Sequence, residues 1–153
     1  MPTLGFPSGP SCHFGVDDYE QMGLSMVPLL ERDSFGKVFD MPITAPDLQR
    51  AYYTSARKDE IALEFDQPVA WIEALAGQFQ LDGEAGKVAS GKVSGNVLKL
   101  QLAATSSAKM AIYLVDKKWD PKTLLYGNNG IAALTFWEVV IGASARERSL
   151  EPE

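Results

Sequence analysis

The sequence predicts a mostly β protein: an antiparallel β-sandwich of jelly-roll type with one α-helix on its N-terminal side. Three observations support this fold class. Apolar residues near the N-terminus follow a helical spacing, seven short β-rich runs come after them, and turn-forming residues separate these runs. Several short strands at such intervals are typical of sandwiches and barrels. We favour a sandwich, because the Pro- and Asp-containing residues 40–47 provide a linker into it.

The helix is expected between residues 13 and 36. The apolar residues near the i, i+3, i+4, i+7 spacing are Val16, Tyr19, Met22, Met26, Leu29 and Leu30. Asp17 followed by Glu20 predicts a capping box, and Gly36 predicts the C-cap. Pro28 removes one backbone hydrogen bond and predicts a kink. The apolar face must be buried against the sandwich or another subunit, so a homodimer through this helix is one expectation.

Residues 37–145 are expected to form the sandwich, and residues 146–153 a charged tail. The β-rich runs are 50–55, 60–65, 78–81, 87–93, 98–103, 110–115 and 132–141. Residues 98–102 alternate strictly between apolar and polar, which predicts one buried and one solvated strand face. Residues 68–75 fit a short helix instead. Turn signals include residues 94–96 and the Gly-Asn-Asn-Gly sequence at 127–130.

Composition excludes several function classes. The 153-residue chain has a formal net charge of −6, which argues against a nucleic-acid or anionic-membrane partner. Its apolar runs are too short to span a bilayer. The first residues lack the pattern of a signal peptide, so a cytoplasmic location is the default expectation. The single cysteine, Cys12, excludes an internal disulfide.

Two stretches carry a family resemblance. The first is Cys-His-Phe-Gly-Val-Asp-Asp-Tyr-Glu-Gln-Met-Gly at residues 12–23, followed by Pro-Leu-Leu-Glu-Arg-Asp at 28–33. It resembles the end of the catalytic domain of SGNH/GDSL-type esterases, in particular bacterial enzymes of the sialate O-acetylesterase type. The second stretch, Trp-Asp-Pro at 119–121 with residues 124–136, is similar to the closing strands of the β-sandwich appended to such domains.

The resemblance implies that residues 1–36, a loop plus a helix, are a remnant of an SGNH-type catalytic domain. It also implies that His13 occupies the place of the catalytic histidine. The sequence departs from the family elsewhere, because no early Gly-Asp-Ser-like block with a serine nucleophile is present. Pro10 stands three residues before His13, where the family usually has an aspartate. The chain thus resembles the downstream third of such an esterase.

His13 is the only histidine and the candidate general base, since the pKa of histidine lies near neutrality. The alternative is a loop histidine without a catalytic partner. A serine triad needs a nucleophile, a base and an orienting group within hydrogen-bond reach, which His13 alone does not supply. The adjacent Cys12 is interpreted as an ordinary cysteine, because neighbouring side chains generally point in different directions.

Asp17, Asp18 and Glu20 form an acidic group beside His13. Carboxylates are the ligands of hard divalent cations such as calcium, and a bound cation could activate water for ester hydrolysis. Helix capping and complementarity to the helix dipole form the alternative that we favour.

The tryptophans suggest a carbohydrate site together with Tyr52, Tyr53, Tyr113 and Tyr126, since aromatic rings stack on the apolar faces of sugars. Trp119, in a turn before Asp120 and Pro121, is the best surface candidate for ligand binding. Of the adjacent Phe136 and Trp137, one should face the core. Core packing is the alternative for each of these rings.

The sequence therefore leaves competing functions. The first is a hydrolase of carboxylic esters or lactones, with His13 as base and cation-assisted attack by water; acyl-homoserine lactones are candidate substrates. The second is a non-catalytic, carbohydrate-binding or accessory β-sandwich module of a larger esterase. A structural remnant without activity is the third.

Overall fold

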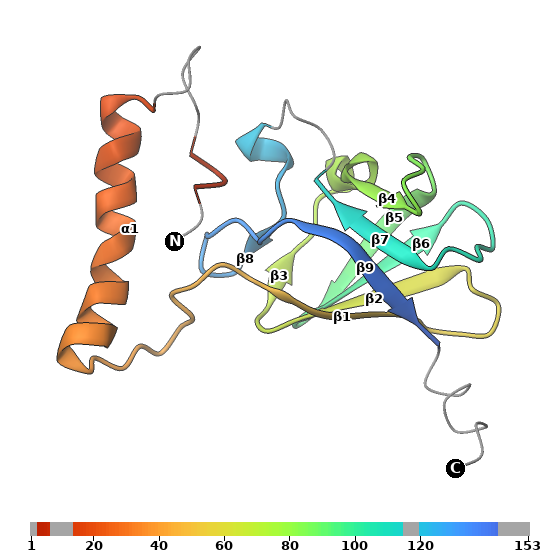
Figure 1. The fold of residues 1–153 in the computed structure, drawn as a ribbon, viewed down its shortest axis with the longest axis horizontal. Helices are drawn as coiled ribbons and strands as arrows, with labels where there is room; N and C mark the ends of the chain where they lie inside the picture. Colours follow the sequence, from red (N-terminus) through yellow and green to blue (C-terminus); the bar gives the residue numbers. More distant parts are fainter. Residues whose placement is uncertain (1–2, 7–13, 115–119, 144–153) are drawn as a thin grey trace.

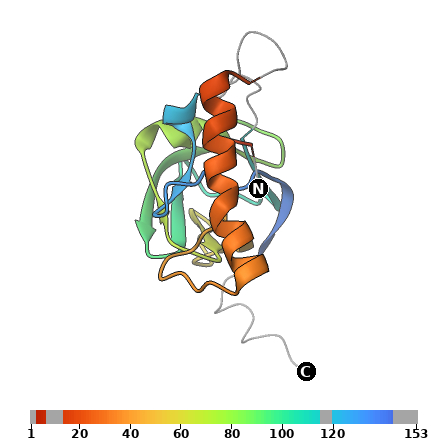
Figure 2. The same ribbon diagram turned by 90° about the vertical axis from the view of Figure 1, so that its left-hand side faces the viewer.

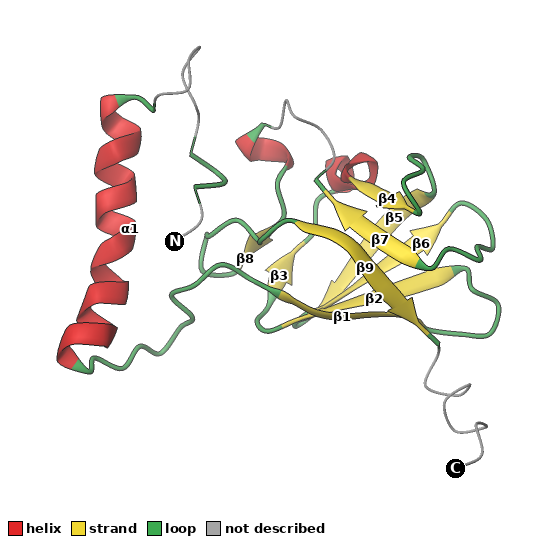
Figure 3. Cartoon of the chain, viewed as in Figure 1, coloured by secondary structure: helices red, strands yellow, loops and turns green. Residues whose placement is uncertain are grey.

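The computed structural model describes residues 3–6, 14–114 and 120–143. Within these residues the chain forms one long helix, α1 (Val16–Phe35), and nine strands (Figures 1 and 3). The strands are β1 (Leu48–Tyr53), β2 (Glu60–Phe65), β3 (Val69–Ala70), β4 (Phe79–Leu81), β5 (Val88–Ser94), β6 (Val97–Leu102), β7 (Met110–Tyr113), β8 (Tyr126–Gly127) and β9 (Phe136–Gly142). Two short 3-10 helices are η1 (Glu73–Gln78) and η2 (Pro121–Thr123). A mostly β fold with one N-terminal helix is confirmed.

Seven strands form one sheet in the order β4-β7-β9-β1-β2-β6-β5, and β3 pairs with β8. Residues from both ends of this order, such as Phe79 of β4 and Val88 of β5, belong to one core cluster. The sheet therefore folds over on itself, and its two halves face each other as the layers of a sandwich.

One strand pair differs from the antiparallel expectation. β1 and β9 run parallel, with Ala51 beside Ile141 and Tyr52 beside Gly142. In chain order these are the first and last strands of the large sheet, and all its other strands lie between them in the sequence. A connection of that length places no hairpin constraint on strand direction, and the parallel pair joins the β4-β7-β9 half of the sheet to the β1-β2-β6-β5 half.

The buried face follows the alternation seen in the sequence. In β6, Leu98, Leu100 and Leu102 are buried while Lys99 and Gln101 are exposed, as predicted. The expected helix at 68–75 is wrong: β3 occupies its start, and η1 begins only at Glu73. Proline and valine at 68–69 favour the extended β3 backbone, which pairs with β8.

The ends of α1 are capped by glycines. Gly15 is the N-cap, and its backbone N–H donates to the Asp18 carboxylate over 3.1 Å. The predicted capping box of Asp17 and Glu20 is thus wrong by two residues, because the helix begins at Val16. At the other end Gly36 has φ 66° and donates to the Arg32 carbonyl, so the predicted C-cap is confirmed.

Helix α1 lies beside the sandwich without being enclosed by it. None of its residues is buried. Figure 2 shows it crossing one side of the sandwich. A 20-residue helix with Pro28 in its interior depends on tertiary contacts for much of its stability.

Trp71 belongs to the packing of the sandwich. Its ring covers Gly91 of β5 and lies 6.1 Å from the ring of Phe79, and its indole N–H donates to Glu73 over 3.1 Å. A Cβ atom at Gly91 would approach the Trp71 ring to 2.5 Å. The backbone of β5 can therefore pass under this ring only as glycine.

Gly91→Ala should lower the free energy of unfolding by roughly 1–3 kcal/mol, because the added methyl group forces the Trp71 ring out of its packing position. Chemical denaturation followed by Trp fluorescence measures the change. Gly77→Ala is the matched control, since nothing lies within 4 Å of a Cβ atom there. Equal stability of both variants would contradict the packing role of Trp71.

Candidate functional site: a groove between the helix and the sandwich

A groove of about 590 Å³ lies where α1, residues 3–6 and the β8 region meet. Its wall is mainly apolar and includes Phe6, Leu29, Ile43 and Ile131. The polar side chains that line it are Gln21, Ser25, Thr44 and Tyr126. This size, with an apolar wall and a few polar groups, is typical of small-molecule binding sites.

The linker between α1 and β1 is fixed to the sandwich by Asn129. The Asn129 amide nitrogen donates to the carbonyl of Thr44 over 2.7 Å and to that of Pro42 over 3.0 Å. It also lies 3.0 Å from the side-chain oxygen of Gln67, a buried residue that itself donates to the Thr44 carbonyl. This Asn129 clamp joins three segments that are distant in sequence, and it sets one wall of the groove.

Gly127 permits the clamp to form. A Cβ atom at this position would lie 2.5 Å from the Asn129 side-chain oxygen and 2.8 Å from the ring of Pro46. The same Asn129 oxygen accepts the backbone N–H of Ile131 over 3.1 Å. The turn at 127–130, which the sequence predicted, therefore holds both strand β8 and the linker.

Tyr126 is the tyrosine that lines the groove. Burial raises the pKa of Tyr126 above its ordinary value, and the charge of Asp120 raises it further. The hydroxyl is therefore protonated at neutral pH. Within the described residues it makes no hydrogen bond, although Gly5 lies next to it in the groove wall. It can donate a hydrogen bond to a ligand oxygen.

Ser25 is the hydroxyl on the helix side of the groove. Its Oγ donates to the backbone carbonyl of Gln21 over 2.8 Å, an ordinary local bond within a helix. A nucleophilic serine needs a base that accepts its proton, and here the proton goes to a carbonyl. Ser25 thus contributes polarity to the groove wall.

Two of the predicted site residues, His13 and Trp119, lie outside the described residues, as does Cys12. The predicted cation ligands lie at the start of α1, where Asp17 and Glu20 are exposed and Asp18 caps Gly15. Among the described residues, no three His, Cys, Asp or Glu side chains are grouped so that they could hold a metal ion. Capping, the alternative role, is what the geometry of Asp18 supports.

The exposed aromatic residue on the sheet is Trp137. Its side chain is 66% exposed on β9, while the neighbouring Phe136 packs against the core. One of the two faces the core, as the sequence predicted.

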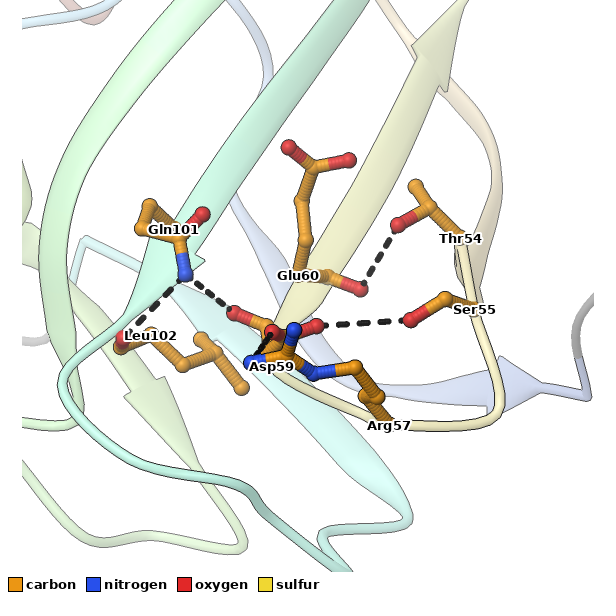
Figure 4. Close-up of polar contacts among 7 residues, drawn as sticks. All are labelled: Thr54, Ser55, Arg57, Asp59, Glu60, Gln101 and Leu102. Carbon is orange, nitrogen blue, oxygen red and sulfur yellow. Dashed lines mark hydrogen bonds and ion pairs between the residues drawn. The ribbon is translucent and has the colours of Figure 1, made fainter.

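A polar cluster at the turn between β1 and β2 stabilises that turn (Figure 4). The Asp59 carboxylate accepts from Ser55 over 3.3 Å and pairs with Arg57 at 3.1 Å, and its carbonyl accepts from Gln101 over 2.9 Å. These bonds close the turn onto β6. The Asp59 carboxylate is shared between Ser55 and Arg57 within this turn, so we interpret the cluster as structural.

Sequence reasoning missed the groove, and it considered Tyr126 only as one of several aromatic rings that could stack on a sugar. The turn at 127–130 was visible, but its contacts with residues 42–46 span more than 80 positions, as in the bond from Asn129 to Thr44. The short strand β8 was also missed, because a strand of two residues shows no periodicity.

No family model and no curated protein matches this sequence. Among solved structures, a carbohydrate acetylesterase from Xanthomonas citri has a similar fold, with a TM-score of 0.62 and 14% sequence identity. The match covers 87% of this chain and 30% of that chain, so this chain spans less than a third of the enzyme. The likeness shows a fold shared with part of that acetylesterase. Within the described residues, no helix combines the length and apolar character needed to cross a bilayer.

Asn129→Ala should lower the free energy of unfolding by about 1–3 kcal/mol, since it removes the hydrogen bonds to the carbonyls of Pro42 and Thr44 and to the side chain of the buried Gln67. Thermal unfolding by circular dichroism measures this. The control is Asn128→Ala, an exposed neighbour in the same turn. If the two variants unfold at the same temperature, the clamp does not hold the linker.

An ultraviolet difference titration of the parent against Tyr126→Phe should show a midpoint above pH 10.0, the ordinary value of a phenol. The folded-state pKa is raised, so the stabilisation from this hydroxyl is complete below the unfolded-state pKa and is lost as the pH rises through the folded-state pKa. A midpoint at or below the ordinary value would show that Tyr126 is fully solvated.

Proposed function

We propose that this chain takes part in the hydrolysis of carboxylic esters carried by carbohydrates, with the groove as the ester-binding site and His13 as general base. The observation that carries the proposal is the fold shared with a carbohydrate acetylesterase over 87% of this chain. The groove lies between α1 and the sandwich.

The groove offers complementary chemistry to such an ester. Its apolar wall suits a short acyl group or the less polar face of a sugar ring. The protonated hydroxyl of Tyr126 can donate a hydrogen bond to the ester carbonyl oxygen. This hydrogen bond strengthens as negative charge develops on that oxygen. Gln21 on α1 can bind a sugar hydroxyl from the opposite side.

In the sequence His13 precedes Gly15, the N-cap of α1, by two residues. Gln21 in the groove wall lies about 9 Å from Gly15 along the helix axis. In the proposed reaction His13 removes a proton from water as the water oxygen bonds to the ester carbon. The tetrahedral intermediate then expels the alcohol oxygen, which takes the proton from His13, leaving acid and alcohol.

Small lactones, including acyl-homoserine lactones, are cyclic esters and extend the proposed substrate range. A divalent cation such as calcium at Asp17, Asp18 and Glu20 is a further part of the proposal, and it would lower the pKa of the attacking water. The described geometry holds no three-ligand group there, so this part rests on the sequence alone.

A second function is an accessory β-sandwich module that supports an esterase whose nucleophile lies on another segment. The specific observation in its favour is that this chain spans 30% of the matching acetylesterase, while its sequence has no Gly-Asp-Ser-like nucleophile block. In that role the groove and the exposed Trp137 would bind carbohydrate without catalysing its hydrolysis.

The purified chain should hydrolyse acetylated xylose and 4-nitrophenyl acetate above the buffer rate, and His13→Ala should lower this rate roughly 10²- to 10⁴-fold. Added imidazole should partly restore the activity of His13→Ala, because it replaces the missing base. Repeating the assay with a chelator tests the cation. A parent rate equal to the buffer blank would overturn catalysis by this chain and leave the accessory role.

A further inference from the structure

The groove beside α1 changes from polar to apolar along its length. Gln21, Ser25 and Leu29 line it at intervals of four residues on one side of the helix, so this wall is about 12 Å long. The polar Gln21 stands at one end of the wall and the apolar Leu29 at the other. None of the described residues that line the groove is charged, although 22% of the chain is. The groove therefore suits uncharged groups, because a buried charge would lose its water without gaining a partner.

The hydrogen-bonding end of the groove lies toward the start of α1. Residues 3–6 lie level with the first half of the helix (Figure 1). The Tyr126 hydroxyl would lie 3.5 Å from a Cβ atom at Gly5, so it belongs to this end. The Ser25 hydroxyl already donates to the Gln21 carbonyl. The groups that this end offers to an ester are thus the phenol of Tyr126 and the side-chain amide of Gln21.

The apolar end of the groove consists of Leu29, Ile43 and Leu134. Leu29 comes from the second half of α1, and Ile43 comes from the linker that follows the helix. The backbone N–H of Leu134 donates to the Pro46 carbonyl over 2.9 Å, which holds Leu134 beside the linker. Thr44 adds a hydroxyl at this end. Three apolar side chains from three segments therefore surround the space beyond the hydrogen-bonding end.

The volume of the groove exceeds what an acetylated sugar fills. An acetyl group on a xylose ring has thirteen non-hydrogen atoms, which need roughly 390 Å³ at about 30 Å³ per atom, the share of a water molecule in the liquid. An octanoyl group on the same ring has nineteen, which need roughly 570 Å³. The groove holds about 590 Å³. Its size therefore matches a longer acyl chain than acetyl.

We propose that the groove selects esters of medium-length acyl chains, such as hexanoyl and octanoyl, over acetyl esters. The acyl chain lies in the apolar end, the ester carbonyl accepts from Tyr126, and the sugar lies toward Gln21. This inference rests on the proposed function and adds the acyl class of the substrate to it. Each methylene that leaves water for the apolar end strengthens binding roughly fourfold, whereas an acetyl group does not reach that end.

Isothermal titration calorimetry with N-acetyl-, N-hexanoyl- and N-octanoyl-glucosamine tests the selection without any reaction, because an amide resists hydrolysis. Below its micelle concentration, the N-octanoyl compound should bind the full chain at least about a hundredfold more tightly than the N-acetyl compound. Equal affinities along the series would overturn this inference and leave ester binding by the groove intact. Binding of none of the three would contradict both.

Variants at the apolar end locate the acyl chain. Leu29→Gln should weaken binding of the N-octanoyl compound at least about tenfold and change that of the N-acetyl compound less than about twofold, since only the longer chain reaches this position. Leu30→Gln is the matched control, because Leu30 is 55% exposed and does not line the groove. Circular dichroism verifies that each variant is folded.

Leu134→Gln repeats the test from the sandwich side, at a residue that is 36% exposed, so that the result does not depend on the helix alone. It should weaken binding of the N-octanoyl compound as Leu29→Gln does. Unchanged binding in both groove variants, or an equal loss in Leu30→Gln, would show that the acyl chain binds elsewhere and would overturn the inference.

Discussion

The arrangement of helix and sandwich depends on the Asn129 clamp. Its amide reaches the carbonyls of Pro42 and Thr44 and the side chain of Gln67, so one turn ties together the linker, the loop after β2 and strand β8. Helix α1 has no buried residue of its own, so the linker contributes to its position beside the sandwich. The groove, which needs walls from both parts, follows from the clamp.

Local features of the fold could be predicted from the sequence because local physics determines them. The structure confirms two such predictions: the alternation of leucine and polar residues in β6 and the glycine C-cap at Gly36. The N-cap was misplaced because Gly15 has no side chain to reveal it, and Asp18 caps in its place. The parallel pairing of β1 and β9 depends on contacts about 90 residues apart, such as that of Ala51 with Ile141, which no local pattern records.

The candidate site likewise has one residue that the sequence could propose and another that only the structure brings into the site. His13 could be proposed from its residue type and its resemblance to an esterase motif, whereas the hydroxyl of Tyr126 became a candidate donor only when its place in the groove wall was known. The side of α1 that carries Gln21 faces the groove.

The central claim is that the groove binds an acylated carbohydrate, and nuclear magnetic resonance tests this most directly. Titrating acetylated xylose into the isotope-labelled chain should shift the amide signals of Ser25, Ile131 and Ala132, which line the groove. Unacetylated xylose should shift them less, because the apolar wall favours the acyl group. Shifts confined to the surroundings of Trp137, or no shifts with either sugar, would contradict the account.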